Sequence, residues 1–483
     1  MNKILFAASE CVPFIKTGGL ADVVGALPKQ FDKNYWDIRV VIPFYKCIKW
    51  ELRRQCEYVT HFYMSAGSYI RNKYVGVMTC IYEGIRFYFI DNEEYFGGDY
   101  PYGEIYLDVE KFTFFDKAVL SILPVINFKP DVIHCNDWQT GFIPVYLRTE
   151  FQADMFFWGM KSLMTVHNLK FQGARDVKAV MGYTGFASYL FTPDKIECNK
   201  DANMLKAGLV YADYITTVSG TYANEIQGWE QGEGLDGLFR ARKFDMQGII
   251  NGIDTELYDP ETDSKIKRTY NIETFRKKKV ANKEALQAEL GLPVDKKKFM
   301  IGMVSRLTEQ KGCDLVGYVM DRIVDENTQF VILGTGDYKY EEMFRYNMRR
   351  FPDRVFVSTS YSDELSRKIY AASDAFLMPS KFEPCGLSQL MAMRYGSVPI
   401  VRATGGLADT VEAYNEFEHT GTGFSFNRYN GEDMLGIINY AKHIYYDKKR
   451  DWNNIAERAM RCDYSWKRPA ARYENIYNYL INK

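Results

Sequence analysis

The sequence lacks the long apolar runs and the cysteine pattern that would place it in a membrane or outside the cell. None of its 483 residues belongs to a run of about 18 apolar residues, so no transmembrane helix is expected and the protein is predicted to be cytoplasmic. Its nine cysteines are odd in number and form no CxxC pair, which argues against a disulfide framework or a zinc module. The apolar run at residues 4–8 is too short for a signal peptide and predicts a first strand.

The sequence also lacks an excess of charge of one sign. Its 61 basic and 62 acidic residues nearly cancel. This balance provides no overall field to attract a polyanion, so neither a nucleic acid nor a membrane is expected as a partner. It leaves room for local cationic clefts that bind smaller anions.

Motifs for metal and hydrolytic chemistry are missing as well. The sequence contains no HExxH, no GxSxG elbow and no GxxxxGK[ST] phosphate loop. The five histidines show no ligand spacing. We therefore expect no metal and no resident cofactor.

Short apolar runs alternate with segments of helical periodicity along the whole chain. The runs cover residues 4–8, 38–42, 132–135, 163–166 and 214–218 in the first half, and 299–304, 330–333, 355–357, 375–378 and 398–401 in the second. This alternation is typical of parallel βαβ units. It predicts an α/β protein of two doubly wound, Rossmann-like domains at 1–250 and 251–464. A C-terminal helix at 465–483 is expected to pack back on the first domain.

Two segments depart from this pattern. Residues 60–115 are richer in Tyr and Gly and predict an antiparallel or irregular insertion in the first domain. The basic run Arg276–Lys279 is expected on the solvated face of a helix.

One hexapeptide occurs twice, as Thr17-Gly18-Gly19-Leu20-Ala21-Asp22 and again at Thr404–Asp409. Paired glycines at a helix start let a ligand approach the backbone, whose N–H groups and dipole favour an anion. Neither copy is the GxGxxG dinucleotide fingerprint. Lys16 precedes the first copy, and Arg306 and Lys311 follow the first strand of the second domain. These cations predict a diphosphate site that needs no metal. The alternatives are ordinary turn-and-cap motifs for the glycines and surface cations near a turn for Arg306 and Lys311.

Polar residues follow two strands of the first half. Asp137 and Trp138 follow the run 132–135, and His167 and Asn168 follow the run 163–166. In this topology the carboxyl ends of strands face the ligand. An acid beside an aromatic ring suits sugar hydroxyls and ring stacking, and a capping role is the alternative for the histidine.

Six segments together resemble bacterial glycogen synthase, a family closely related to plant starch synthase. They are Lys16–Val23, Asp131–Trp138, Thr165–Leu169, Ser305–Gly312, Pro379–Leu387 and Arg402–Asp409. The resemblance implies the GT-B glycosyltransferase fold, two Rossmann-like domains facing across a cleft. It also implies transfer of glucose from ADP-glucose to the non-reducing 4-hydroxyl of an α-1,4-glucan, with retention, in glycogen biosynthesis.

The resemblance implies a role for each matching position. Four residues are implied to act in catalysis: His167 near the sugar carbon under attack, Arg306 and Lys311 on the distal phosphate, and Glu383 on the donor glucose. Substrate binding is implied for Lys16, Gly18, Gly19, Thr404 and Gly405 at the phosphate turns, Cys385, Gly386 and Leu387 beside Glu383, Tyr361 against adenine, and Asp137, Trp138 and Asn168 on the acceptor side.

Two positions depart from related glycosyltransferases. Many retaining members carry a second acid eight positions after the first, where this chain has Met391. An Asp-Asn pair that often follows the first glycine-rich loop is replaced by Leu107-Asp108-Val109. Because no carboxylate is placed to act as a nucleophile, we expect front-face substitution in which the leaving ADP accepts the acceptor's proton.

Three alternatives remain open on the sequence alone. One is another GT-B enzyme, such as a sucrose synthase or a UDP-glucose-dependent transferase. The second is a silent nucleotide- or glucan-binding scaffold, and the third a Rossmann oxidoreductase. The acceptor is expected to be glycogen or a malto-oligosaccharide. The sequence leaves undecided the oligomeric state, the preferred chain length of the acceptor, and whether the product is glycogen or a starch-like glucan.

Overall fold

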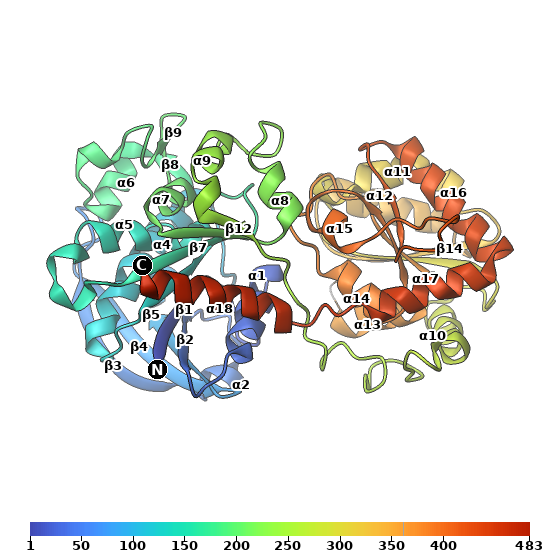
Figure 1. Ribbon diagram of the computed structural model, residues 1–483, viewed down its shortest axis with the longest axis horizontal. Helices are drawn as coiled ribbons and strands as arrows, with labels where there is room; N and C mark the ends of the chain where they lie inside the picture. Colours follow the sequence, from blue (N-terminus) through green and yellow to red (C-terminus); the bar gives the residue numbers. More distant parts are fainter. Residues whose placement is uncertain (361) are drawn as a thin grey trace. The chain divides into compact units, whose positions relative to one another are not determined.

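The chain forms two compact units, each with its own hydrophobic core. The computed structural model describes residues 1–360 and 362–483. Unit 1 comprises Met1–Asn251 and Trp466–Lys483, and unit 2 comprises Gly252–Ser465 (Figure 1). Among the described residues, no helix has the length and apolar character needed to cross a membrane.

Unit 1 is built on a nine-stranded sheet with the order β12-β11-β7-β6-β1-β2-β5-β4-β3. The strands are β1 (Asn2–Ala7), β2 (Trp36–Pro43), β3 (Glu57–Met64), β4 (Lys73–Tyr82), β5 (Ile85–Asp91), β6 (Val132–Asn136), β7 (Lys161–Val166), β11 (Tyr214–Thr217) and β12 (Met246–Gly248). From β12 to β5, neighbouring strands pair in parallel. The chain changes winding direction between β1 and β6, so the loops after these two strands lie at a topological switch point.

Helices flank this sheet, which explains why its central strands are continuous apolar runs. They are α1 (Gly19–Ala26), α2 (Trp50–Arg53), α3 (Glu93–Phe96), α4 (Ile105–Val125), α5 (Ile143–Arg148), α6 (Val177–Thr184), α7 (Met204–Tyr211), α8 (Gly220–Glu225), α9 (Asp236–Ala241) and α18 (Lys467–Asn482). The C-terminal helix α18 lies across β1 (Figure 1), with the Tyr477 hydroxyl 2.8 Å from His134 Nδ1 on β6. A small separate sheet joins β8 (Ala174–Asp176), β10 (Asp201–Asn203) and β9 (Glu197–Cys198).

The segment 60–115 is only partly the insertion that the sequence predicted. Its antiparallel character is confirmed, because β4 pairs antiparallel with both β3 and β5. However, β5 also pairs in parallel with β2, so the segment extends the main sheet. From Ile105 onward it is the start of α4, which is buried on most sides and therefore has no clear polar face.

Unit 2 contains a six-stranded parallel sheet with the order β15-β14-β13-β16-β17-β18. The strands are β13 (Phe299–Val304), β14 (Thr328–Leu333), β15 (Val355–Ser358), β16 (Ala375–Met378), β17 (Val398–Arg402) and β18 (Phe424–Phe426). Numbered along the chain, this order is 3-2-1-4-5-6, the doubly wound arrangement of dinucleotide-binding folds. The predicted α/β class with two doubly wound sheets is confirmed.

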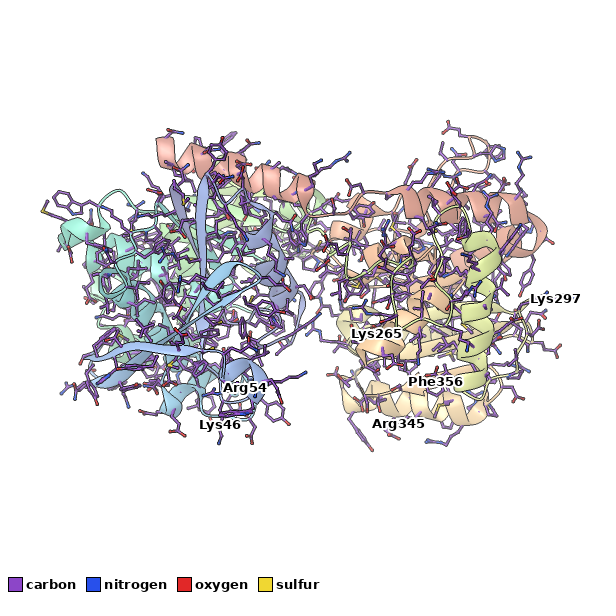
Figure 2. The ribbon with its side chains drawn as sticks, turned by 90° about the horizontal axis from the view of Figure 1, so that it is seen from below. Lys46, Arg54, Lys265, Lys297, Arg345 and Phe356 are labelled. Atoms are coloured by element: carbon purple, nitrogen blue, oxygen red, sulfur yellow. The ribbon has the colours of Figure 1, made fainter. Side chains whose placement is uncertain are left out.

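The helices of unit 2 precede, connect and follow these strands. They are α10 (Phe275–Glu289), α11 (Cys313–Ile323), α12 (Tyr338–Arg350), α13 (Asp363–Ala372), α14 (Ser388–Arg394), α15 (Gly405–Thr410), α16 (Gly431–Asp447) and α17 (Lys449–Arg461). On the outside of this unit, Figure 2 shows Lys297 and Arg345 projecting away from the sheet.

The basic run at the start of α10 is not wholly solvated, contrary to the sequence prediction. Arg276 and Lys277 are exposed, but Lys279 turns inward. Its Nζ donates to the carbonyl oxygens of Tyr370 and Tyr395 at 2.9 and 3.0 Å. Lys279 thus satisfies carbonyl groups at the ends of α13 and α14, which have no N–H donor inside their own helices.

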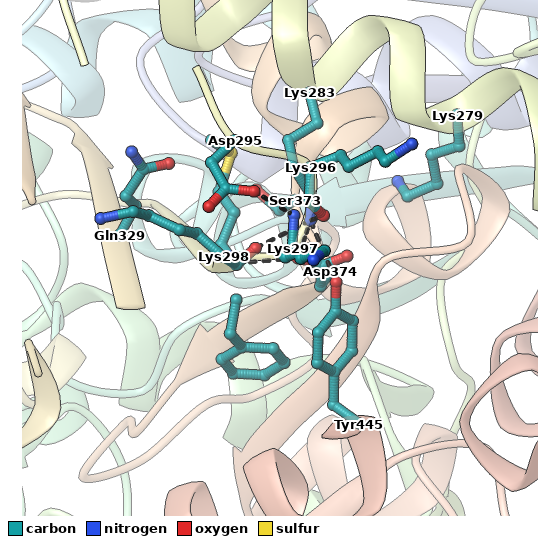
Figure 3. A network of polar contacts seen from close by, with 12 residues as sticks. Lys279, Lys283, Asp295, Lys296, Lys297, Lys298, Gln329, Ser373, Asp374 and Tyr445 are labelled. Atoms are coloured by element: carbon teal, nitrogen blue, oxygen red, sulfur yellow. Dashed lines mark hydrogen bonds and ion pairs between the residues drawn. The ribbon is translucent and has the colours of Figure 1, made fainter. Parts of the chain in front are cut away.

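One turn further along α10, Lys283 forms a buried ion pair with Asp374 at 2.5 Å (Figure 3). The two side chains are only 4% and 13% exposed. Asp374 also accepts the N–H of Met300 at 2.8 Å, and Lys283 also donates to the carbonyl oxygen of Lys298 at 2.9 Å. The pair therefore ties α10 to the start of β13 and to the loop before β16.

Replacing Lys283 by methionine should destabilise unit 2 strongly. The substitution leaves the Asp374 carboxylate buried without its cation, which costs about 3–5 kcal/mol of unfolding free energy. Denaturant unfolding measures the loss. The control is Arg350→Met, which breaks an ion pair with Asp321 whose side chains are 38% and 58% exposed. That variant should lose less than about 1 kcal/mol of unfolding free energy. Equal losses in both variants would contradict a stabilising role for the buried Lys283–Asp374 pair.

Candidate active site

The loop after β1 is shaped by a buried glutamate. Glu10 Oε2 accepts the backbone N–H groups of Thr17 at 2.5 Å and Gly18 at 3.3 Å, while its Oε1 accepts the Thr17 hydroxyl at 2.8 Å. The Tyr102 hydroxyl donates to the same Oε1 at 2.9 Å. Glu10 was not identified from the sequence, because a single acid after a strand forms no motif. Its position at the carboxyl end of β1, seven residues before the glycine turn, was the available signal.

The first glycine turn opens α1, which begins at Gly19 with Gly18 as its N-cap. The backbone at Gly18 is extended, with φ −153°, and a Cβ there would meet no atom within 4 Å. Neither strain nor crowding therefore requires glycine here, and its effect is to leave the backbone open to approach. Lys16 Nζ lies 2.7 Å from Asp22 Oδ1 in the first turn of α1. The structure thus places Lys16, Gly18 and Gly19 on one turn at the start of α1.

Asp137, directly after β6, is turned toward the next strand end. Its Oδ1 accepts the backbone N–H of His167 at 2.7 Å and of Asn168 at 3.4 Å. Its φ of +58° is uncommon for a residue with a side chain and is typical of functional loops. Burial raises the pKa of Asp137 to about 7, against the lowering effect of these two hydrogen bonds. In this structure the carboxylate positions the His167–Asn168 backbone.

His167 is held as a neutral imidazole. Its Nε2 lies 2.9 Å from Asn136 Oδ1. The Asn136 amide nitrogen donates to the carbonyl oxygens of Ala7 and His134, both at 3.1 Å, so Oδ1 is its acceptor atom. Nε2 must therefore carry the proton, and Nδ1 carries the lone pair. Burial lowers the pKa of His167 to about 3, which keeps the ring uncharged near neutral pH.

Trp138 lies in the core of unit 1. It is 4% exposed, and its ring packs edge to face on Phe112 at a centroid distance of 5.3 Å. A Cβ at Gly173 would stand 2.2 Å from the indole. This packing argues against the predicted stacking on an acceptor sugar, because the ring is covered by its own unit.

In unit 2 the predicted cation and acid meet at the carboxyl ends of β13 and β16. Lys311 Nζ lies 2.5 Å from Glu383 Oε2, with side chains 15% and 7% exposed. The Ser380 hydroxyl donates to the same oxygen at 2.9 Å. Arg306 is exposed and reaches Gln310 Oε1 at 3.3 Å. Lys311 and Glu383 are therefore brought together, and Arg306 stands on the same loop as Lys311.

The second glycine turn interlocks with the Glu383 segment. Gly405 begins α15 with φ +46°, and a Cβ there would stand 2.0 Å from the carbonyl oxygen of Glu383. Gly406 N–H donates to that oxygen at 3.0 Å. Only glycine fits this close approach, which fixes the turn against the loop carrying the acid.

The remaining predicted residues of unit 2 surround this contact. Thr404, the N-cap of α15, and Cys385 are both buried. Gly386 has φ +72°, and Leu387 is the N-cap of α14. Tyr361, predicted to lie against adenine, falls outside the described residues. Over residues 1–360 and 362–483, no group of three or more His, Cys, Asp or Glu side chains could hold a metal ion.

The two positions that depart from related enzymes both lie in buried surroundings. Met391 is buried on α14. Asp108 accepts the N–H of Gly103 at 2.9 Å and forms an ion pair with Lys111. It therefore holds the loop before α4 in place.

Comparison with known proteins agrees with this geometry over the full chain. Residues 3–241 match the family model of the starch synthase catalytic domain, and residues 284–459 match glycosyl transferases group 1. The chain is 60% identical to glycogen synthase of Lachnospira eligens over 99% of its length and 58% identical to that of Lachnoclostridium phytofermentans over 99%, covering 100% of each relative.

A solved structure gives the same assignment. The catalytic domain of starch synthase IV from Arabidopsis thaliana, bound to ADP and acarbose, matches with a TM-score of 0.90 and 30% identity, covering 100% of this chain and 99% of that one. The two-domain glycosyltransferase fold predicted from the sequence is thus confirmed. The chain belongs to the glycogen synthase family of glucosyltransferases.

Proposed function

We propose that the chain transfers glucose from ADP-glucose to the non-reducing 4-hydroxyl of an α-1,4-glucan, with retention and without a metal ion. The observation that carries this proposal is the Lys311–Glu383 pair beside the interlocked turn at Gly405. It places a cation, an acid and a helix start in one small region of unit 2. The related starch synthase was solved with ADP and acarbose, which supports a nucleotide donor and a glucan acceptor.

The reaction needs charge stabilisation more than a nucleophile. As the bond between the glucose C1 and the diphosphate breaks, negative charge grows on the phosphate oxygen. Lys311 and Arg306 supply positive charge there, and backbone N–H groups at the start of α15 add their dipoles. The acceptor 4-hydroxyl attacks C1 from the face that the diphosphate leaves, and its proton passes to the departing phosphate. Glu383 orients Lys311 and accepts hydrogen bonds from the donor glucose.

Unit 1 carries a histidine of fixed protonation and two acids that hold loops in place. Neutral His167, with its proton on Nε2, presents Nδ1 as an acceptor for a sugar hydroxyl. Asp137 fixes the His167 backbone, and Glu10 fixes the turn that carries Lys16, Gly18 and Gly19. All nine cysteines are free thiols, which supports a reducing, cytoplasmic location.

Replacing Lys311 by alanine should lower turnover with labelled ADP-glucose and glycogen by about 100- to 1,000-fold, the cost of losing one donor to a developing charge. The assay contains a chelator, and wild-type activity should persist in it. Replacing ADP-glucose by UDP-glucose should reduce wild-type incorporation. Lys381→Ala is the matched control, because Lys381 is half exposed and pairs with Glu309 at 2.8 Å. Near-normal turnover of Lys311→Ala would refute the assignment.

Replacing Glu10 by glutamine should reduce kcat/KM for ADP-glucose by about 10- to 100-fold. The amide keeps the side-chain volume but turns one acceptor into a donor facing the N–H of Thr17, and an unsatisfied buried group costs about 1–3 kcal/mol. Steady-state kinetics measures the change. Glu94→Gln, which alters an exposed acid paired with Lys73, should leave kcat/KM unchanged. Equal kinetics for both variants would remove Glu10 from the site.

Replacing Asp137 by asparagine should change the pH dependence of stability. Burial raises the folded-state pKa to about 7, above the unfolded value of about 3.9. The folded state therefore binds the proton more tightly, and wild-type stability falls as pH rises from about 4 to about 7. Asparagine does not titrate, so the unfolding free energy of the variant lacks this decline. The difference in unfolding free energy, variant minus wild type, should therefore increase between about pH 4 and pH 7 and stay constant above that interval. Unfolding at a series of pH values measures this, and a constant difference would contradict it.

A further inference from the structure

Two cysteines lie opposite each other at the edge of the unit 1 sheet. Strands β3 and β4 are antiparallel, and their ladder ends with Glu57 opposite Thr79. Continuing that register by one residue places Cys56 opposite Cys80. Directly opposed residues of an antiparallel pair have Cα atoms about 4.5–5.5 Å apart. This separation lies within the range of about 4.4–6.8 Å that a disulfide spans.

The two thiols also influence each other's ionisation. Cys80 lowers the pKa of Cys56, whereas Cys56 and burial raise the pKa of Cys80. Cys56 Sγ donates to the carbonyl oxygen of Leu52 at 3.6 Å, which holds its side chain just before β3. Strand register places the two cysteines opposite each other, and their mutual effect on the pKa agrees with that placement.

The pair is accessible from one side. Cys56 is half-buried, and Arg54 and Gln55 just before it are exposed, whereas Cys80 is buried. Figure 2 shows Arg54 at the outside of unit 1. Because the thiolate is the reactive form of cysteine, the two residues have unequal roles. Cys56 is the attacking thiol, and Cys80 is the resolving thiol beneath it.

We infer that Cys56 and Cys80 form a modification site at which a low-molecular-weight disulfide oxidises them to a reversible intramolecular disulfide. The Cys56 thiolate attacks one sulfur of the small disulfide, whose S–S bond breaks and releases one thiolate. The Cys80 thiolate then attacks Cys56 Sγ, which forms the protein disulfide and releases the second thiolate. Two protein thiols lose two electrons, the small disulfide gains them, and the two thiol protons end on the released thiolates.

The buried cysteines elsewhere lack this arrangement. Cys11, Cys135 and Cys313 are buried, and burial raises the pKa of each thiol, to about 12 for Cys313. Cys47 is half-buried like Cys56, but burial raises its pKa. Cys56 differs from these four cysteines because it is partly exposed and has a second cysteine opposite it in the strand register.

The disulfide would link the segment between α2 and β3, which contains Cys56, covalently to Cys80 on β4. Arg53 already ties α2 to the end of β2, since its Nη1 donates to the carbonyl oxygen of Tyr45 at 2.5 Å and its guanidinium lies 4.0 Å from the Phe44 ring centroid. A covalent link from Cys56 to Cys80 closes a loop around residues 57–79. Closing a loop restricts the unfolded chain, so the oxidised protein should unfold at a higher temperature.

The test uses the full chain and glutathione disulfide. After incubation, free thiols are alkylated and the protein is mapped by mass spectrometry. We expect one cross-linked peptide pair containing Cys56 and Cys80, loss of the pair on treatment with dithiothreitol, and a higher unfolding temperature for the oxidised form. The control Cys47→Ser should give the same cross-link.

Two further variants separate the roles of the thiols. Cys80→Ser removes the resolving thiol, so Cys56 should retain one glutathione as a stable mixed disulfide with no rise in unfolding temperature. Cys56→Ser should leave Cys80 unmodified, because Cys80 is buried. Three results would overturn the inference. They are a persistent glutathione adduct on Cys56 in wild type, a disulfide to a different cysteine, and no reaction of Cys56 at all.

Discussion

Parallel strand pairing is the constraint on which both groups of site residues depend. It brings strand ends together at one edge of each sheet, so loops far apart in sequence start side by side. In unit 1, Ala7 is opposite Cys135 and Asn136 is opposite Thr165. Asp137 can therefore reach the backbone after β7, and Asn136 can orient the His167 ring. In unit 2, Met378 is opposite Val401, and the loops that follow carry Glu383 and Gly405.

The repeated hexapeptide is stabilised differently in the two units. In the first copy a side chain, Glu10, accepts the N–H groups of Thr17 and Gly18. In the second copy a backbone carbonyl, that of Glu383, accepts the N–H of Gly406. The second solution leaves the Glu383 carboxylate available to Lys311. Identical sequence thus gives different turns, because Gly18 is extended at φ −153° as the N-cap of α1, whereas the matching Gly405 has φ +46° and begins α15. The neighbouring loop decides whether a side chain or a backbone carbonyl holds the turn.

The central parallel strands, the fold class and the helix starts at the paired glycines could be predicted because they depend on local pattern. Strands buried on both faces appear as apolar runs, and paired glycines mark a helix start. Helix α4 was missed because residues as polar as Asp116 and Lys117 are buried on it, which removes the amphipathic pattern. The packing of Trp138 and the role of Glu10 depend on Phe112 and Tyr102, whose proximity only the tertiary fold determines.

The Lys311–Glu383 pair also explains how unit 2 keeps two nearly buried charges before substrate arrives. Burying either charge alone would carry a large desolvation free energy. Their mutual attraction at 2.5 Å offsets that penalty. An ammonium has three donors, so Lys311 can hold Glu383 and still donate to an arriving phosphate. In the proposed reaction Arg306, which is exposed on the same loop, is the second cation for that phosphate. Because Glu383 already fixes the position of the Lys311 ammonium, the proposed site needs little rearrangement as charge grows on the leaving group.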